Sequence, residues 1–210
     1  MVLSPDRRRA HVANMGTFQY SLVEERQGDD ARGLSFPPFG YPSAEAKRGT
    51  VVDGRRVPGL GDPNVPEACS VWSVDVTDPS RLRVVEKTKT GVPVGRAVGG
   101  SSPAGLAITT DTLFVSNSVN DAVEAYDTTT LKRRWRTVLA PDPAHRHLRG
   151  VLPFGMDVSP DGKRLYVAES GINSVAVLDP VTGRQRGRIP VAWYPAKVRV
   201  SPDNRVLYVA

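Results

Sequence analysis

The chain has 210 residues, 40% of them hydrophobic and 24% charged, with a formal net charge of +6. Its 19 glycines and 18 prolines exceed average usage together, which favours a sheet protein with many turns over a helical one. No stretch approaches the ~20 apolar residues that span a bilayer, and the single cysteine, Cys69, excludes an internal disulfide framework.

The N-terminal segment, MVLSPDRRRAHVANMG, lacks the apolar core and the cleavage site of a secretory signal. The protein is therefore either cytoplasmic or a piece of a longer protein whose natural N-terminus is missing. The repeats described next favour the second interpretation.

One sequence pattern recurs four times along the chain. It begins at Ser4 (SPDRRRAHVAN), Thr109 (TTDTLFVSN), Ser159 (SPDGKRLYVAES) and Ser201 (SPDNRVLYVA). A second pattern follows the first three, and reads SVWSVDVTDP from Ser70, DAVEAYDTTT from Asp121 and SVAVLDPVTG from Ser174. Tyr166 and Tyr208 lie 42 residues apart, which is typical of propeller repeats.

The third copy shows what each piece of the repeat should form. The segment 159–162, SPDG, suits a type I turn because serine, proline and glycine occupy their preferred positions. The segment 164–168 is rich in β-branched and aromatic residues and predicts a strand. A strand from Ser174, a turn over 179–183 and a last strand over 184–191 follow, so each unit is four short antiparallel strands, as in one propeller blade.

These spacings predict an all-β chain, a β-propeller fragment of about three and a half four-stranded antiparallel blades in an incomplete ring. Residues 1–98 are expected to form a partial first blade, with a long, largely irregular loop inserted at about 17–67. Residues 99–140 should form the second blade, and residues 141–192 the third, with a short insertion at about 140–150. Residues 193–210 should form the first half of the fourth blade. An open arc of blades leaves strand edges exposed, so we expect truncation at both ends.

Several segments resemble the YVTN family of β-propeller repeats, namely LYVAES, SPDG and SVAVLD. The run from Arg149 to Pro195, with GGSSPAGLAI and VSNSVNDAVEAYD before it, is similar to the propeller half of bacterial proteins that join a propeller to an alkaline-phosphatase-like phosphoesterase domain. The resemblance implies a periplasmic or extracellular protein that is longer than this chain. The phosphoesterase half, with its two metal ions and its nucleophile, is absent, so we expect no catalytic residue, metal ligand or cofactor here.

Both departures from the repeat fall on one face of the propeller, where second strands lead to third strands and blades connect. Loops on a rigid scaffold are where binding residues concentrate. The candidate binding residues on this loop face are Asn117, Asn120, Glu169, Asn173, Trp193 and Tyr194. The alternative is structural: asparagines often satisfy loop backbone, and aromatic residues at blade junctions often fill the gap between blades.

Other clusters predict less. Asp142, His145 and His147 fit no standard zinc spacing, and Gly99 to Ser102 is a weak phosphate loop because no helix or lysine follows it. The basic cluster Lys132, Arg133, Arg134 and Arg136 around Trp135 is expected to be the solvated face of a strand, so we predict no nucleic-acid binding.

Three functions compete on this evidence. The first is a non-catalytic scaffold or binding module of a secreted phosphoesterase-type protein, whose partners are an unknown ligand or protein on the loop face, the rest of its own propeller and a C-terminal domain. The second is a lactonase-like or quinoprotein-like enzyme with its site in the central funnel, where only Asp157 could serve as an axial ligand. The third is nucleic-acid binding, which would weaken steeply with salt.

Overall fold

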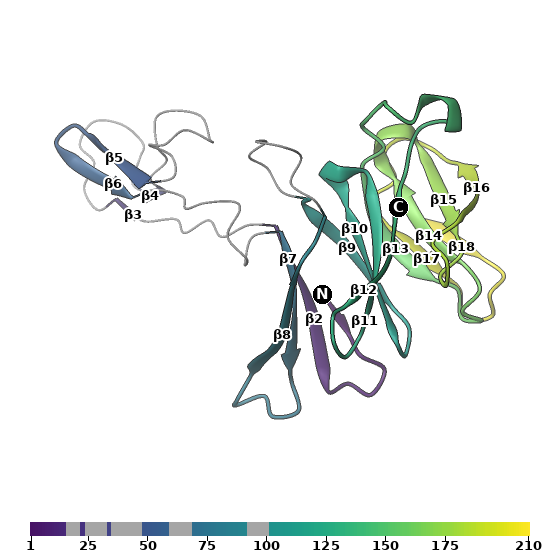
Figure 1. The fold of residues 1–210 in the computed structure, drawn as a ribbon, viewed down its shortest axis with the longest axis horizontal. Coiled ribbons are helices and arrows are strands. Elements are labelled where there is room, and N and C mark those ends of the chain that lie inside the picture. The colour runs from purple at the N-terminus through teal and green to yellow at the C-terminus, as the bar shows by residue number, and fades with distance from the viewer. Residues whose placement is uncertain (16–21, 24–32, 35–47, 59–68, 92–100) are drawn as a thin grey trace.

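A computed structural model describes residues 1–15, 22–23, 33–34, 48–58, 69–91 and 101–210. Three four-stranded antiparallel sheets and one two-stranded sheet follow each other along the chain (Figure 1). Blade 1 contains β1 (Val2–Leu3), β2 (Arg9–Asn14), β7 (Ser70–Asp75) and β8 (Arg83–Lys89). Blade 2 contains β9 (Pro103–Ile108), β10 (Thr112–Asn117), β11 (Ala122–Asp127) and β12 (Arg133–Val138).

Blade 3 contains β13 (Pro153–Val158), β14 (Leu165–Glu169), β15 (Ser174–Leu178) and β16 (Gln185–Pro190). The half-blade is the pair β17 (Val198–Val200) and β18 (Leu207–Val209). Three short 3-10 turns complete the blades, η1 (Ser118–Asn120), η2 (Pro143–His145) and η3 (Ser170–Ile172). The predicted all-β fold, a partial β-propeller of four-stranded antiparallel sheets, is confirmed.

The first turn of a blade is closed by a serine that makes the same hydrogen bonds in three repeats. The hydroxyl groups of Ser4, Ser159 and Ser201 donate to the aspartate two residues later over 2.6, 2.6 and 2.5 Å. Each hydroxyl oxygen also accepts a backbone N–H from the strand that follows, at 2.9 Å. These bonds explain why the repeated Ser-Pro-Asp ends one strand and begins the next.

The last turn of a blade is organised by an aspartate that accepts backbone amides. Asp127 accepts the N–H groups of Thr129 and Thr130, and its equivalent Asp179 accepts those of Val181 and Thr182. These amide bonds, together with an arginine on the following strand, lower the pKa of Asp179 to about 2. The turn therefore stays charged and closed at any physiological pH.

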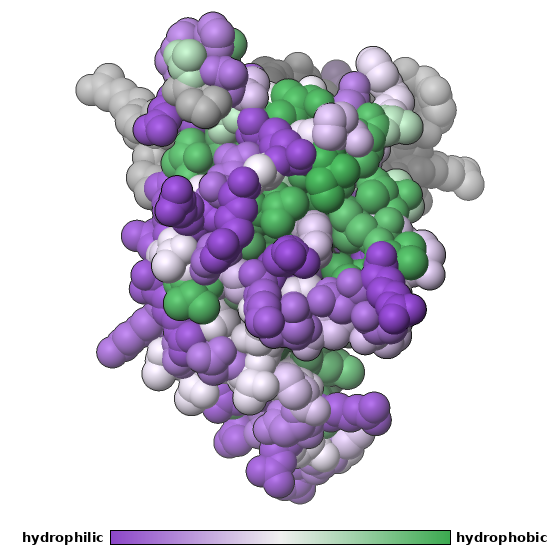
Figure 2. Space-filling model, turned by 90° about the vertical axis from the view of Figure 1, so that its right-hand side faces the viewer, coloured by the Kyte–Doolittle hydropathy of each residue, from purple (hydrophilic) through white to green (hydrophobic). Residues whose placement is uncertain are grey.

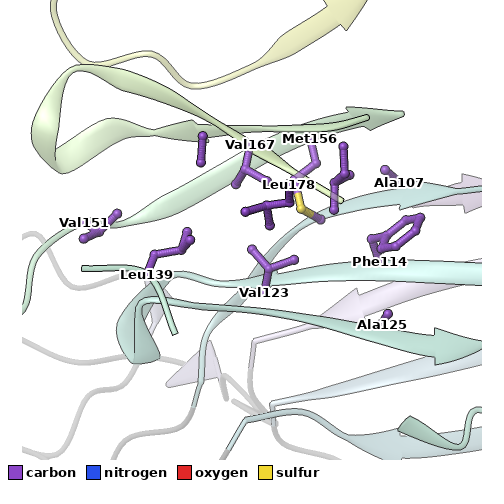
Figure 3. Packing of buried hydrophobic residues seen from close by; sticks show 11 residues of the cluster. Ala107, Phe114, Val123, Ala125, Leu139, Val151, Met156, Val167 and Leu178 are labelled. Carbon is purple, nitrogen blue, oxygen red and sulfur yellow. The ribbon is translucent and has the colours of Figure 1, made fainter. Parts of the chain in front are cut away.

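The blades pack face to face through apolar side chains. Between blades 2 and 3, Phe114, Val123 and Leu139 lie with Met156, Val167 and Leu178 in one buried cluster (Figure 3). A second cluster between blades 1 and 2 contains Val71, Leu113, Val115 and Tyr126. The hydrophobic core is thus divided into layers, one between each pair of neighbouring blades.

The innermost strands approach each other closely. β9 contacts β13, and β13 contacts β17. Ser116 on β10 donates to the carbonyl oxygen of Phe154 over 2.6 Å and accepts the amide of Gly105 at 2.8 Å. A Cβ atom at Gly105 would lie 2.2 Å from the Phe154 oxygen, so only glycine allows this approach.

Much of the inserted segment at 17–67 lies outside the described residues. The described part contains the short pair β3 (Leu22–Val23) and β4 (Gly33–Leu34) and a hairpin of β5 (Gly49–Val52) and β6 (Arg55–Pro58). Within this expected loop, residues 49–58 thus form a regular hairpin. The turn residues Asp53 and Gly54 both have positive φ, and Asp-Gly is a typical pair for a two-residue hairpin turn, a signal that the prediction did not use.

Among the described residues, no helix has the length and apolar character needed to cross a bilayer.

Candidate functional site

On the loop face, blades 2 and 3 are each fastened to the next unit by the side chain of a residue whose backbone is in the left-handed conformation. Asp121 follows η1 with φ 48°, and its carboxylate accepts the amides of Gly150 and Leu152 at 2.8 and 2.9 Å. Asn173 follows η3 with φ 55°, and its Oδ1 accepts the amide of Tyr194 at 2.9 Å. The same latch therefore holds the entry to blade 3 and the entry to the half-blade.

The backbone that these latches hold is itself unusual. Leu152 and Tyr194 have φ values of 50° and 53°, and each precedes a proline. Proline restricts the residue before it to extended conformations in most contexts. The latch hydrogen bonds compensate for this cost, and the hydroxyl of Ser170 adds a bond to the carbonyl of Pro195 at 2.6 Å. The connections between blades are thus rigid at the points where they cross the loop face.

A buried carboxylate lies between blades 1 and 2. Glu124 on β11 is fully buried and accepts hydrogen bonds from Asn117 Nδ2 (2.9 Å), the Tyr126 hydroxyl (2.6 Å) and the amide of Gly91 (2.8 Å). Arg133 pairs with its other oxygen at 2.9 Å. Burial and the adjacent Glu124 carboxylate raise the pKa of the Tyr126 phenol, which therefore remains a hydrogen-bond donor.

A second buried carboxylate lies between blades 2 and 3. Glu169 is fully buried, and both of its oxygens accept from Arg188, at 2.7 and 2.9 Å. The hydroxyl of Ser174 donates to it at 2.5 Å. Arg188 also donates to the carbonyl groups of Ala140 and Pro141 in the exit from blade 2. Glu169 and Arg188 therefore join the two blades, and three hydrogen bonds already hold the Glu169 carboxylate.

The six predicted binding residues consequently divide into two groups. Asn117, Asn120 and Glu169 are buried. The partners described above hold the Asn117 Nδ2 amide and the Glu169 carboxylate, whereas Asn117 Oδ1 has no hydrogen-bond partner among the described residues. Asn173 is half-buried and engaged in its latch, whereas Tyr194 is 48% and Trp193 87% exposed. Among these six, a hydrogen bond joins Asn173 to Tyr194. For the asparagines and Glu169, this geometry favours the structural alternative.

Trp193 occupies a position that is covered in the other blades. Its equivalents are Ser101 and Val151, whose carbonyl oxygens accept the amides of Val119 in η1 and Gly171 in η3. Both are buried. No described residue makes the same contact with the backbone of Trp193, and its ring is exposed beside Tyr194. In the repeat, the residue equivalent to Val119 and Gly171 falls after position 210, so the exposure of these two rings does not by itself mark a binding site.

Sequence reasoning missed the residues that organise this face, which are Asp121, Glu124, Arg133 and Arg188. A signal existed for the first of them. Aligning the second-to-third loops, SVND and SGIN, places Asp121 opposite Asn173 as a small polar residue able to adopt a left-handed conformation. The carboxylate–arginine pairs had no local signal, because their partners lie on different strands.

The innermost strands surround a cavity of about 550 Å³ that corresponds to the central funnel. Asp157, Lys197 and Arg199 are its charged lining residues. One Asp157 oxygen accepts the amide of Val200 at 2.8 Å and lies 3.7 Å from Arg199 Nε. This carboxylate therefore fastens β17 to β13.

The other clusters of the sequence find ordinary partners. Asp142 caps η2 by accepting the amide of Ala144, and His145 Nδ1 lies 3.5 Å from its carboxylate. Among the described residues, no three histidine, cysteine, aspartate or glutamate side chains gather as metal ligands. In the basic cluster, Arg134 pairs with Asp111 and Asp127, and Trp135 donates to the Pro180 carbonyl of blade 3.

Comparison with known proteins gives the fold. No protein-family model matches the chain, and no curated protein sequence matches it. Among solved structures, a protein from Lactobacillus plantarum aligns with a TM-score of 0.53 and 19% identity over 74% of the chain. Hydrazine synthase from Kuenenia stuttgartiensis aligns with a TM-score of 0.46 and 28% identity over 52% of the chain. Sqt1 from Saccharomyces cerevisiae aligns with a TM-score of 0.48 and 11% identity over 62% of the chain.

The chain spans 52%, 29% and 31% of the lengths of these three structures, in that order. The neighbours have β-propeller-type folds. The alignment with the Lactobacillus plantarum protein agrees with the fold of the chain, a partial β-propeller.

Proposed function

We propose that the chain is the propeller part of a larger protein and that it acts as a binding scaffold. The observation that carries this proposal is the fastened loop face, on which Asn173 holds the backbone of Tyr194 next to Trp193. Tyrosine and tryptophan on a rigid backbone are typical anchors of interfaces, because little conformational entropy is lost when they bind. These two residues are the proposed contact with the partner.

The larger protein that we propose is a secreted, periplasmic or extracellular phosphoesterase-type protein, in which this chain precedes a metal-dependent hydrolase domain. The support is the resemblance of the segment from Arg149 to Pro195 to the propeller half of such proteins. The test is the coding sequence that follows Ala210. Further blades and then a domain rich in histidine and aspartate are expected, and a reading frame that ends after the remaining blades overturns this proposal.

The second candidate function is an enzyme whose site is the central cavity, because Asp157 and Lys197 line that cavity. An activity screen of the 210-residue chain against phosphate esters, lactones and alcohols with a quinone distinguishes the two. The scaffold proposal predicts no turnover above background. Turnover that Asp157→Asn abolishes, with unchanged folding by circular dichroism, would instead establish the funnel enzyme.

A further inference from the structure

A groove runs between the outer strands of blades 2 and 3, apart from both the loop-face aromatics and the central cavity. It has a volume of about 760 Å³ and lies between β12 and β16, with part of the short insertion at its edge. Four of its lining residues are arginines, and none is acidic. The full lining is Thr137, Val138, Ala140, Arg146, Arg184, Gln185, Arg186, Gly187 and Arg188.

Two of the arginines form a fixed wall of the groove. Arg188 is held by Glu169 and by the carbonyl oxygens of Ala140 and Pro141, and its side chain is only 21% exposed. Arg186 pairs with Asp179 in the last turn of blade 3. Because these guanidinium groups are anchored, a ligand that meets them would lose little side-chain entropy on their account.

The opposite wall is held in place from blade 3. The hydroxyl of Thr137 on β12 donates to the carbonyl of Gly183 over 2.7 Å. A Cβ atom at Gly183 would lie 2.6 Å from that hydroxyl oxygen and equally close to the Trp135 ring, so the two blades meet tightly at the base of the groove. The spacing between its walls is therefore set by the fold.

The other two arginines supply charge that the described part of the chain does not neutralise. Arg146 and Arg184 are exposed, and no described carboxylate lies within ion-pair distance of either guanidinium group. Their lining neighbours Arg186 and Arg188 each have one carboxylate partner. The groove thus carries an excess of two positive charges in a hollow where solvent screens them less than on an open surface.

We propose that this groove binds a small phosphate-bearing ligand with two adjacent negative charges, such as an organic diphosphate or a phosphate monoester, between Arg146 and Arg184. The planar guanidinium fork pairs with phosphate oxygens through two parallel hydrogen bonds, which a lysine cannot do. All four cations are arginines, which favours phosphate recognition over general attraction of anions. This inference does not depend on the proposed scaffold function.

The test is titration calorimetry of the 210-residue chain with pyrophosphate at low ionic strength, with succinate in a parallel titration. One site is expected for pyrophosphate, and binding of succinate is expected to be at least about tenfold weaker. Arg184→Gln and Arg146→Gln should each weaken pyrophosphate binding at least about tenfold, because each removes charge-assisted hydrogen bonds. Both residues are exposed, so folding is expected to survive and melting temperatures should verify it.

The matched control is Arg164→Gln, which removes the same charge at an exposed position outside the groove. It should leave the dissociation constant unchanged. Weakening by Arg164→Gln equal to that by Arg184→Gln would show attraction by net charge alone and overturn the proposal. Equal binding of succinate, or no binding of pyrophosphate at any concentration up to the millimolar range, would overturn it as well.

Discussion

Glu124 and Glu169 illustrate how single residues hold this fold together. Each carboxylate is fully buried, and each is paired with an arginine and with at least one hydroxyl group. A buried charge without partners costs several kcal/mol, so complete pairing is a condition for placing it there. Arg188 links blade 3 to the exit from blade 2 through the carbonyl groups of Ala140 and Pro141, whereas Glu124 pairs with Arg133 within blade 2 and accepts the amide of Gly91 after blade 1.

His11 is the residue where this rule is broken. It lies on β2 at the position that Phe114 occupies in blade 2 and is fully buried, and neither ring nitrogen has a hydrogen-bond partner among the described residues. Burial, with a smaller contribution from the charge of Arg9, lowers its pKa from 6.5 to about 4. The neutral imidazole therefore serves as an apolar filler between blades 1 and 2.

His11 should make the chain sensitive to acid. Between pH 6.5 and about 4 the unfolded chain takes up a proton on this side chain that the folded chain excludes, so stability decreases as the pH falls through this window. His11→Phe removes the side chain that takes up this proton and replaces it with the residue type found at the equivalent position, Phe114. We expect the difference in melting temperature between pH 7.5 and pH 5 to be smaller in the variant than in the parent chain.

The control for this prediction is His145→Gln, because His145 is 57% exposed on η2. That variant should show the same pH dependence as the parent chain. If His11→Phe also keeps the parental pH dependence, the buried imidazole does not contribute to it.

At the scale of elements, two strands of neighbouring blades can pack closely only where no side chain stands between their backbones. Gly105 on β9 and Gly187 on β16 are both strand glycines with negative φ, yet they differ in surroundings. A Cβ atom at Gly105 would clash with the backbone of Phe154, whereas one at Gly187 would meet nothing within 4 Å. The first glycine is needed for blade packing, and the second is not.

This difference gives a paired prediction. Gly105→Ala should lower the free energy of unfolding by about 1–3 kcal/mol, because the overpacked inner strands must move apart. Gly187→Ala should be neutral or raise it by about 0.5 kcal/mol, since alanine restricts the unfolded chain. Urea denaturation of both variants measures the difference. Equal effects of the two substitutions would mean that β9 and β13 do not meet as described.

Local chemistry made the strands and turns predictable. The Ser-Pro-Asp turns recur with the same hydrogen bonds at Ser4, Ser159 and Ser201, and a repeated pattern of this kind is visible without knowledge of the fold. The hairpin at Asp53 and Gly54 was equally local but was obscured by its irregular surroundings. Boundaries of the strands within a blade followed from these turns.

The candidate site was less predictable because its contacts join distant residues. Glu169 and Arg188 are 19 residues apart in the sequence, and Arg188 also bonds to Ala140, which is 48 residues away from it. The repeat placed Asn117 and Glu169 at the correct end of their strands, but it could not show that both side chains turn inward. Exposure of Trp193 likewise depends on which elements cover the blade entry.

At the scale of the whole molecule, the chain is an arc of stacked sheets that carries an uneven surface. Figure 2 shows apolar side chains gathered on the side where the half-blade lies, next to polar regions. Exposed apolar residues of the half-blade include Val206, Tyr208 and Val209. Surfaces of this kind are typical of places where further structure packs.

Blades 2 and 3 must stack face to face, because the Asp121 latch, the Glu169–Arg188 pair and the arginine groove all lie between these two blades. The most direct test is nuclear Overhauser spectroscopy of the labelled chain. Cross-peaks are expected between the Trp135 ring protons and Gly183, and between Gly105 and Phe154, which are close in space but distant in sequence. Absence of both sets of cross-peaks in a folded sample would contradict the stacked-blade structure.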